Sequence, residues 1–267
     1  MSDTTGSSSR VQTVFNTLLD LRPFGDPWLE GLWTMAAATR PGRATKPPAS
    51  LGTLLIEEAP SERPARAGRV FERPVAPPAA FLRWLLEHPQ AMDVRDRDTF
   101  GAKSDDVRAW RRRLFSSNPA DVAAAKEEGS RQLGSRLAQR GRNKWWLFEG
   151  FARIDACFVS DECVLLVDAQ PADAARPSTL WFPTRTQLWR NVEAAKELSA
   201  GKPFGVILVV EHEAEGIAAM ADADRSLDGS YPHLEADEKA ELAGHLLGFI
   251  TWAAIVSRFN LPATDVL

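Results

Sequence analysis

The stretch RIDACFVSDECVLLVDAQP, residues 153–171, decides the fold class of this chain. It holds two short apolar runs on either side of the dipeptide Asp161-Glu162, and each run has the length and composition of a β-strand. A two-residue turn at this dipeptide predicts an antiparallel hairpin in which the numbers of paired residues add up to 323. In that register Asp155 lies directly opposite Asp168.

Two opposed carboxylates in a sheet need a compensating interaction. Directly opposed side chains have Cβ atoms about 4.5–5.5 Å apart, and like charges placed there destabilise the sheet. Three explanations fit the sequence: a divalent cation bound by both groups, a proton shared between them, or strand ends where solvent, Arg153 or Arg185 neutralises each carboxylate. Gln170 follows Asp168 by two residues and is therefore expected on the same strand face.

Helix and strand signals alternate around the hairpin. A helix begins at Pro119 and ends at Gly141, and a capping box formed by Thr184 and Gln187 opens a second helix. The second helix is expected to end near residue 199, and strands are expected at 144–148, 152–159, 163–169 and 204–211. The order from residue 119 to 211 is therefore helix, strand, strand, strand, helix, strand.

The hairpin residues and this element order together resemble the PD-(D/E)XK nuclease superfamily. That superfamily has a restriction-endonuclease-like α-β-β-β-α-β core with a mixed sheet, an acid on the second strand and an acid-x-Lys motif on the third. Asp155 matches the first acid, and Asp168-Ala169-Gln170 matches the second motif with Gln in place of Lys. The resemblance covers about a third of the chain. It implies a phosphodiesterase that acts on nucleic acid, with Mg²⁺ or Mn²⁺ on Asp155 and Asp168.

The resemblance implies roles for further residues. Gln170 would orient the attacking water, but it lacks the charge of a lysine. The first helix of the superfamily often supplies another metal-binding acid, which here is Glu128, while Glu149 at the end of the first strand is the alternative. Arg185 and Arg190, near or on the capped helix, are the predicted phosphate-binding residues. Because of Gln170, a catalytically inactive nuclease-like protein that serves binding or assembly is the alternative function.

The rest of the chain is expected to surround this core. Residues 1–115 are predicted to form a loop-rich and helical N-terminal arm, and residues 116–267 to form the core with a C-terminal helix; one compact domain is the alternative. The arm is expected to contain a disordered leader at 1–10, a strand at 51–58, and helices at 11–20, 77–88 and 105–115, the last capped by Ser104. The C-terminal helix is expected at 235–259.

Composition excludes several classes of protein. The 267 residues carry a net charge of −4, so bulk charge favours neither nucleic acid nor an anionic membrane. Residues 103–144 contain eleven Lys and Arg against five Asp and Glu, which is either a phosphate-binding face or a solvated helix surface.

The only two cysteines, Cys157 and Cys163, lie in apolar runs and indicate reduced thiols in a cytoplasmic protein. No apolar run is long enough to span a bilayer.

Overall fold

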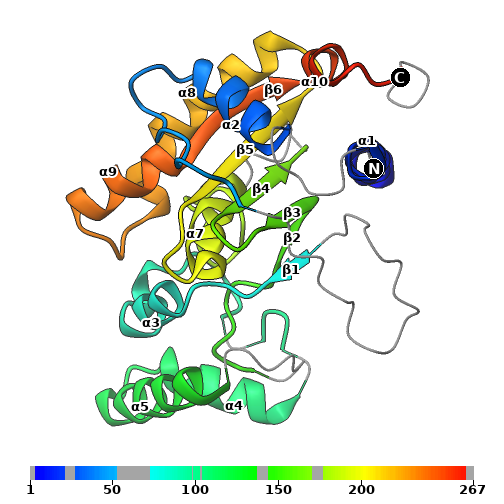
Figure 1. Cartoon of the computed structure of the whole chain (residues 1–267). Helices are drawn as coiled ribbons and strands as arrows, with labels where there is room; N and C mark the ends of the chain where they lie inside the picture. The colour runs from blue at the N-terminus through cyan, green and yellow to red at the C-terminus, as the bar shows by residue number, and fades with distance from the viewer. Residues whose placement is uncertain are drawn as a thin grey trace.

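A computed structural model describes residues 4–21, 28–52, 73–97, 99–102, 104–136, 144–169 and 177–262. The chain is an α/β protein built on a mixed sheet with the strand order β3-β4-β5-β6 (Figure 1). The strands are β3 Ala156–Val159, β4 Val164–Asp168, β5 Phe204–Val210 and β6 Leu246–Thr251. β3 and β4 are antiparallel, whereas β4, β5 and β6 run parallel to one another. β4 and β5 are buried along their whole length, as expected for parallel strands covered on both faces.

The β3–β4 hairpin confirms the predicted register. Its pairs run from Ala156 opposite Val167 to Val159 opposite Val164, so each pair adds up to 323. The buried Ser160 hydroxyl fixes the turn, because it accepts hydrogen bonds from the backbone N–H groups of Glu162 at 3.1 Å and Cys163 at 2.7 Å. The side chain of Ser160 thus stabilises a turn whose sequence is a weak hairpin signal by itself.

The strand predicted at 152–159 is interrupted at Asp155. The preceding part, β2 Ala152–Ile154, leaves the sheet and pairs antiparallel with β1 Arg73–Val75. In one continuous strand, residues 154 and 156 face the same side. Here Ile154 packs in the core on the α7 side of the sheet and Ala156 in the core on the α1 side, so the chain bends between them.

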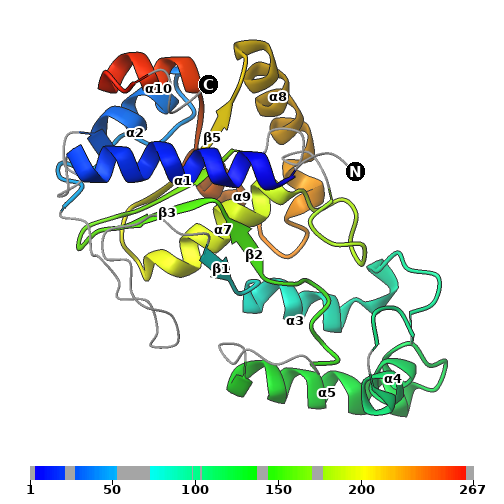
Figure 2. The same cartoon turned by 90° about the vertical axis from the view of Figure 1, so that its right-hand side faces the viewer.

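Two layers of helices cover the sheet, and each layer has its own apolar core. On one face lie α1 Thr4–Leu21, α2 Trp28–Ala38 and α10 Trp252–Phe259, which Figure 2 shows beside one another. On the other face lie α7 Gln187–Ser199, α8 Glu213–Ser230 and α9 Ala236–His245. Segments from both ends of the chain therefore contribute to the core on the α1 side.

A third apolar core lies in a helical lobe at the far end of the molecule from α8 and α10 (Figures 1 and 2). We define the helical lobe as the segment 144–148 together with α3 Ala79–Glu87, the short 3-10 helix η1 Pro89–Ala91, α4 Asp105–Leu114 and α5 Pro119–Arg136. Ser104 caps α4 as predicted, since its side chain accepts a hydrogen bond from Val107 N at 3.3 Å. α5 packs against α3 and α4.

The segment 144–148, predicted as a strand, is a loop. Trp145, Trp146 and Phe148 are buried among the helices of the lobe, and Trp146 Nε1 donates to Gln132 Oε1 at 3.0 Å. Its apolar residues therefore face helices rather than another strand. Among the described residues, the first strand after α5 is β2 instead.

The predicted C-terminal helix at 235–259 is wrong. The chain forms α9, the strand β6 and α10 in turn. The run LLGFIT is apolar throughout, and a short buried apolar run has the same pattern in a strand as in a helix. Gly248 favours the strand, because its φ of +138° is outside the helical region and it lies at the bulge where β6 changes register against β5.

The N-terminal part also differs from the expectation. α1 includes residues 4–10, which were predicted to be disordered, and α2 was not predicted. Of the predicted strand at 51–58, all but Leu51 and Gly52 lies outside the described residues.

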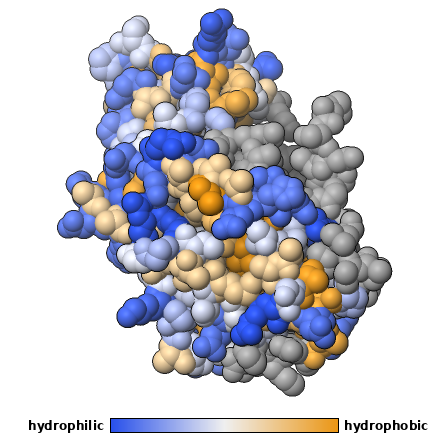
Figure 3. Space-filling model, turned by 90° about the horizontal axis from the view of Figure 1, so that it is seen from above, coloured by the Kyte–Doolittle hydropathy of each residue, from blue (hydrophilic) through white to orange (hydrophobic). Residues whose placement is uncertain are grey.

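Large apolar side chains are seldom exposed on the described surface. No helix in the described part of the chain is long and apolar enough to cross a bilayer. Leu21, Leu180 and Ile217 are the large apolar side chains that are well exposed among the described residues. On the face shown in Figure 3, apolar residues are interspersed with polar ones, which is ordinary for a globular surface.

Candidate functional site

The structure brings the two aspartates of the hairpin together at its open end. Asp155 lies at the bend before β3, and Asp168 is the last residue of β4, one position beyond the pair of Ala156 and Val167. Both are buried, with 3% and 5% of their surface exposed. Asp155 Oδ2 accepts a hydrogen bond from the backbone N–H of Ala169 at 3.0 Å, so its carboxylate reaches across to the strand that carries Asp168.

Helix α7 presents a row of polar side chains to Asp168. Asn191 is fully buried, and its Nδ2 donates to Asp168 Oδ2 at 2.5 Å. Gln187 Nε2 donates to Asn191 Oδ1 at 3.0 Å, and Arg190 donates to Gln187 Oε1 at 3.4 Å. We call Gln187, Arg190 and Asn191 the α7 polar row. Their spacing of three and four residues places them on one side of the helix.

The local start of α7 is not the predicted capping box. The helix begins at Gln187, and its N-cap residue Thr186 makes no side-chain cap hydrogen bond. Thr184 instead donates to the carbonyl of Gly229 at 3.0 Å, and Gln187 turns toward Asn191. Thr184 therefore links the start of α7 to α8, and Gln187 bonds a side chain within α7.

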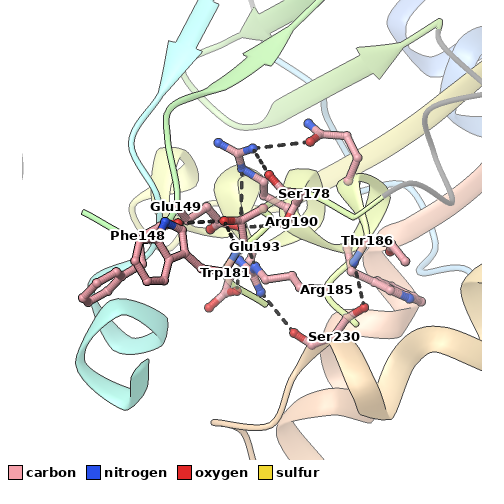
Figure 4. Close-up of polar contacts among 12 residues, drawn as sticks. Phe148, Glu149, Ser178, Trp181, Arg185, Thr186, Arg190, Glu193 and Ser230 are labelled. Carbon is pink, nitrogen blue, oxygen red and sulfur yellow. Dashed lines mark hydrogen bonds and ion pairs between the residues drawn. The ribbon is translucent and has the colours of Figure 1, made fainter. Parts of the chain in front are cut away.

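Arg185 is the centre of a buried group of charges next to this row (Figure 4). Its side chain is fully buried; Nε lies 2.9 Å from Glu149 Oε1, and a terminal nitrogen lies 2.8 Å from Glu193 Oε2. The guanidinium also donates to the carbonyl of Ser230 at 3.2 Å and lies 4.0 Å from the ring centroid of Phe81. Arg185 therefore joins the helical lobe, α7 and the end of α8.

This position does not suit the predicted phosphate-binding role of Arg185 and Arg190. Arg190 is 5% exposed and donates to the carbonyls of Gly150 and Ser178, while its Nε lies 3.8 Å from Glu149 Oε1. Both guanidinium groups are thus held inside the protein by acceptors of the chain itself. An arginine that binds a phosphate backbone has to be reachable from solvent.

Glu149 is likewise a counter-ion in this structure. Its side chain is fully buried, and its Oε1 accepts hydrogen bonds from Arg185 and, at 2.7 Å, from the Ser178 hydroxyl. The alternative metal ligand, Glu128, lies on α5 and is bonded to Arg131 and Gln132 of the same helix. α5 packs in the helical lobe, away from the hairpin (Figure 1), so Glu128 does not join the two aspartates.

Burial and pairing shift the pKa values of this group in opposite directions. For Arg185, burial alone lowers the pKa, but the carboxylates of Glu149 and Glu193 outweigh it and raise the pKa above its ordinary value. For Glu193, burial raises the pKa, but Arg185 and His233 outweigh it and lower the pKa. Burial dominates for Arg190 and lowers its pKa.

Glu193 and His233 were not predicted from the sequence. His233 Nε2 lies 2.8 Å from Glu193 Oε1, and both side chains are nearly inaccessible to solvent. The sequence gives no signal for Glu193, because three of its four helical neighbours at a distance of three or four positions are charged, namely Arg190, Lys196 and Glu197.

Of the predicted metal ligands, Asp155 and Asp168 are the two that the structure places next to each other. No group of three or more His, Cys, Asp or Glu side chains with metal-binding geometry occurs in the described ranges. Mg²⁺ is commonly bound by one or two carboxylates with water and substrate oxygens completing the shell. The hydrogen bonds to Oδ2 of both aspartates are of the kind that orient metal-binding carboxylates. Gln170, the third predicted site residue, lies outside the described residues.

No family model, curated protein or solved structure matches the chain. The resemblance to PD-(D/E)XK nucleases therefore depends on the hairpin residues and the element order alone.

Proposed function

We propose that the chain is a Mg²⁺- or Mn²⁺-dependent phosphodiesterase that acts on nucleic acid through a restriction-endonuclease-like core. The observation that carries this proposal is the hairpin register, which brings two buried aspartates together at the open end of β3 and β4. Nearby hydrogen bonds orient both carboxylates, and the order β3, β4, α7, β5 supports the resemblance. The first strand of the resembled core is not found in the described part of the sheet, because 144–148 is a loop and β2 pairs with β1.

In this proposal the side chains of the protein orient the metal ion and the attacking water, and the metal ion supplies the positive charge that acts on the phosphate. A bound divalent ion would polarise a phosphate and lower the pKa of a water molecule next to it. Asp155 and Asp168 would hold that ion, and Asn191 would orient Asp168. Gln170 would hold the attacking water by hydrogen bonds.

A catalytically inactive protein that binds or assembles is the second candidate. Gln170 in place of the usual lysine favours it, and so does the burial of Arg185 and Arg190 in ion pairs. A metal titration combined with a cleavage assay separates the two candidates, because only the phosphodiesterase requires both a bound cation and cleavage.

The experiment follows the melting temperature of the wild type and of the Asp168→Asn variant while Mg²⁺ or Mn²⁺ is added. A ligand at 100 times its Kd stabilises the folded state by about 2.7 kcal/mol. For a chain of this size that corresponds to a rise in Tm of roughly 5–10 °C. We expect this rise for the wild type alone, and cleavage of DNA or RNA that requires the same metal.

The Asp168→Asn variant is expected to melt higher than the wild type without metal. The substitution removes one of two neighbouring buried charges, while the new amide oxygen still accepts the bond from Asn191. The pair of aspartates would be structural if two results came together: neither metal changes the Tm of the wild type, and the Asp168→Asn variant melts at a lower temperature than the wild type. Inactivity of a metal-binding wild type on all nucleic acids would favour the second candidate.

A further inference from the structure

We infer that Asn191 is a positioning residue for Asp168, and that the α7 polar row sets its orientation. This inference rests on the proposed function, because it assigns Asn191 to the control of a metal-binding carboxylate.

The hydrogen bonds of the row have a defined direction. Arg190 has only donors and gives one to Gln187 Oε1, which directs the Gln187 amide nitrogen toward Asn191. Gln187 Nε2 then donates a hydrogen bond to Asn191 Oδ1. The other end of the Asn191 amide, Nδ2, therefore points toward Asp168. An ionised carboxylate has only acceptors, so each amide has one orientation that satisfies its neighbours on both sides.

The start of the row is fixed by segments that precede α7 in the chain. Arg190 donates to the carbonyls of Gly150 and Ser178 and lies near Glu149. These acceptors come from segments outside α7, so they hold the guanidinium independently of the helix. The orientation of Asp168 is therefore determined by side chains of α7, of which Asn191 lies 23 residues away in sequence, rather than by β4 alone.

Burial makes the amide of Asn191 sensitive to replacement. Asn191 is fully buried and Asp168 is 5% exposed, so bulk water does not readily replace a lost bond between them. Partners that orient metal-binding groups typically change metal affinity 10- to 100-fold when they are removed. Asn191→Leu keeps the branched shape and removes both the donor and the acceptor.

The test is the metal concentration that gives half of the maximal rise in Tm. For Asn191→Leu we expect it to increase by about 10- to 100-fold over the wild type. Gln187→Met should increase it less, because the Asn191 bond remains but loses its orienting neighbour. Ser199→Ala is the control: Ser199 is buried on the same helix and donates to Lys196 O at 2.7 Å, two turns from Asn191. It should leave the metal response unchanged.

A second measurement does not need metal. If the Asn191 bond holds Asp168, the Tm loss caused by Asn191→Leu should be smaller in an Asp168→Ala background than in the wild-type background. Equal losses in both backgrounds overturn the inference, as does a metal response of Asn191→Leu equal to that of Ser199→Ala. A wild type without any metal response overturns the proposed function instead, and this inference with it.

Discussion

Replacing Arg185 by Met is the most direct test of the buried charge group. The substitution keeps an unbranched side chain of moderate length and removes the cation that pairs with Glu149 and Glu193. Both carboxylates then stay in the interior with much less compensation, since they are 0% and 4% exposed. Removal of one partner from a buried ion pair costs about 3–5 kcal/mol. We expect at least this loss at pH 7, which is a large part of the usual 5–15 kcal/mol of a folded domain.

The loss should shrink as the pH falls. Arg185 and His233 lower the pKa of Glu193 in the folded protein, so this carboxyl group contributes stability above its unfolded pKa of about 4.3. That contribution disappears as the pH falls through the folded value. Without Arg185, burial raises the pKa of Glu193 and the group protonates inside the fold. The difference in unfolding free energy between variant and wild type should therefore be smaller near pH 4 than at pH 7, and should shrink further as the pH falls through the lowered pKa of Glu193.

Urea unfolding followed by tryptophan fluorescence at both pH values measures this difference. Arg225→Met is the control, because Arg225 forms an exposed ion pair with Asp222 on α8 and its removal should change stability by less than about 0.5 kcal/mol. Adding Glu193→Gln to Arg185→Met should recover part of the loss. A loss below about 1 kcal/mol at pH 7, or one that does not depend on pH, would refute the role that we assign to Arg185.

Two further predictions concern Gly248 and Gln170. Gly248→Ala should lower stability by about 1–3 kcal/mol in urea unfolding, because its φ is +138° and a Cβ there would lie 2.3 Å from the Ala36 carbonyl oxygen. Gly134→Ala, on α5 with nothing within 4 Å of the added carbon, should match or exceed the wild type; equal stability of the two variants would contradict this account of β6. Gln170→Lys should increase metal-dependent cleavage of DNA or RNA near neutral pH if the wild type is a weakened nuclease, since a nearby ammonium favours a metal-bound hydroxide. If neither the wild type nor Gln170→Lys cleaves nucleic acid in the presence of metal, the result counts against catalysis.

The hairpin could be predicted because its signals are local. The apolar runs and the turn lie within twenty residues, and together they fixed the register that places Asp155 and Asp168 at its open end. Strand β5 and the end of α7 before Gly201 follow from equally local patterns. The bend at Asp155 could not be predicted, because β2 turns away to pair with β1, which is far earlier in the sequence.

The charge group around Arg185 had no local signal at all. Its partners Glu149 and Ser230 are 36 and 45 residues away, so the sequence around Arg185 gives the same pattern as an exposed arginine near a helix start. β6 was missed for a different reason: the apolar run LLGFIT sits between two real helices, and its period does not distinguish a buried strand from a continued helix.

The contact between α2 and β6 has a consequence for how the chain matures on the ribosome. Thr39, just after α2, accepts a hydrogen bond from the backbone N–H of Phe249 in β6, 210 residues later in the sequence. Trp33 and Leu247 belong to the same core. Helices α1 and α2 therefore leave the ribosome before β6, and their apolar faces stay uncovered by that strand until about 210 further residues have been made. Such distant pairing makes folding slow and makes the growing chain depend on protection from aggregation until β6 has been synthesised.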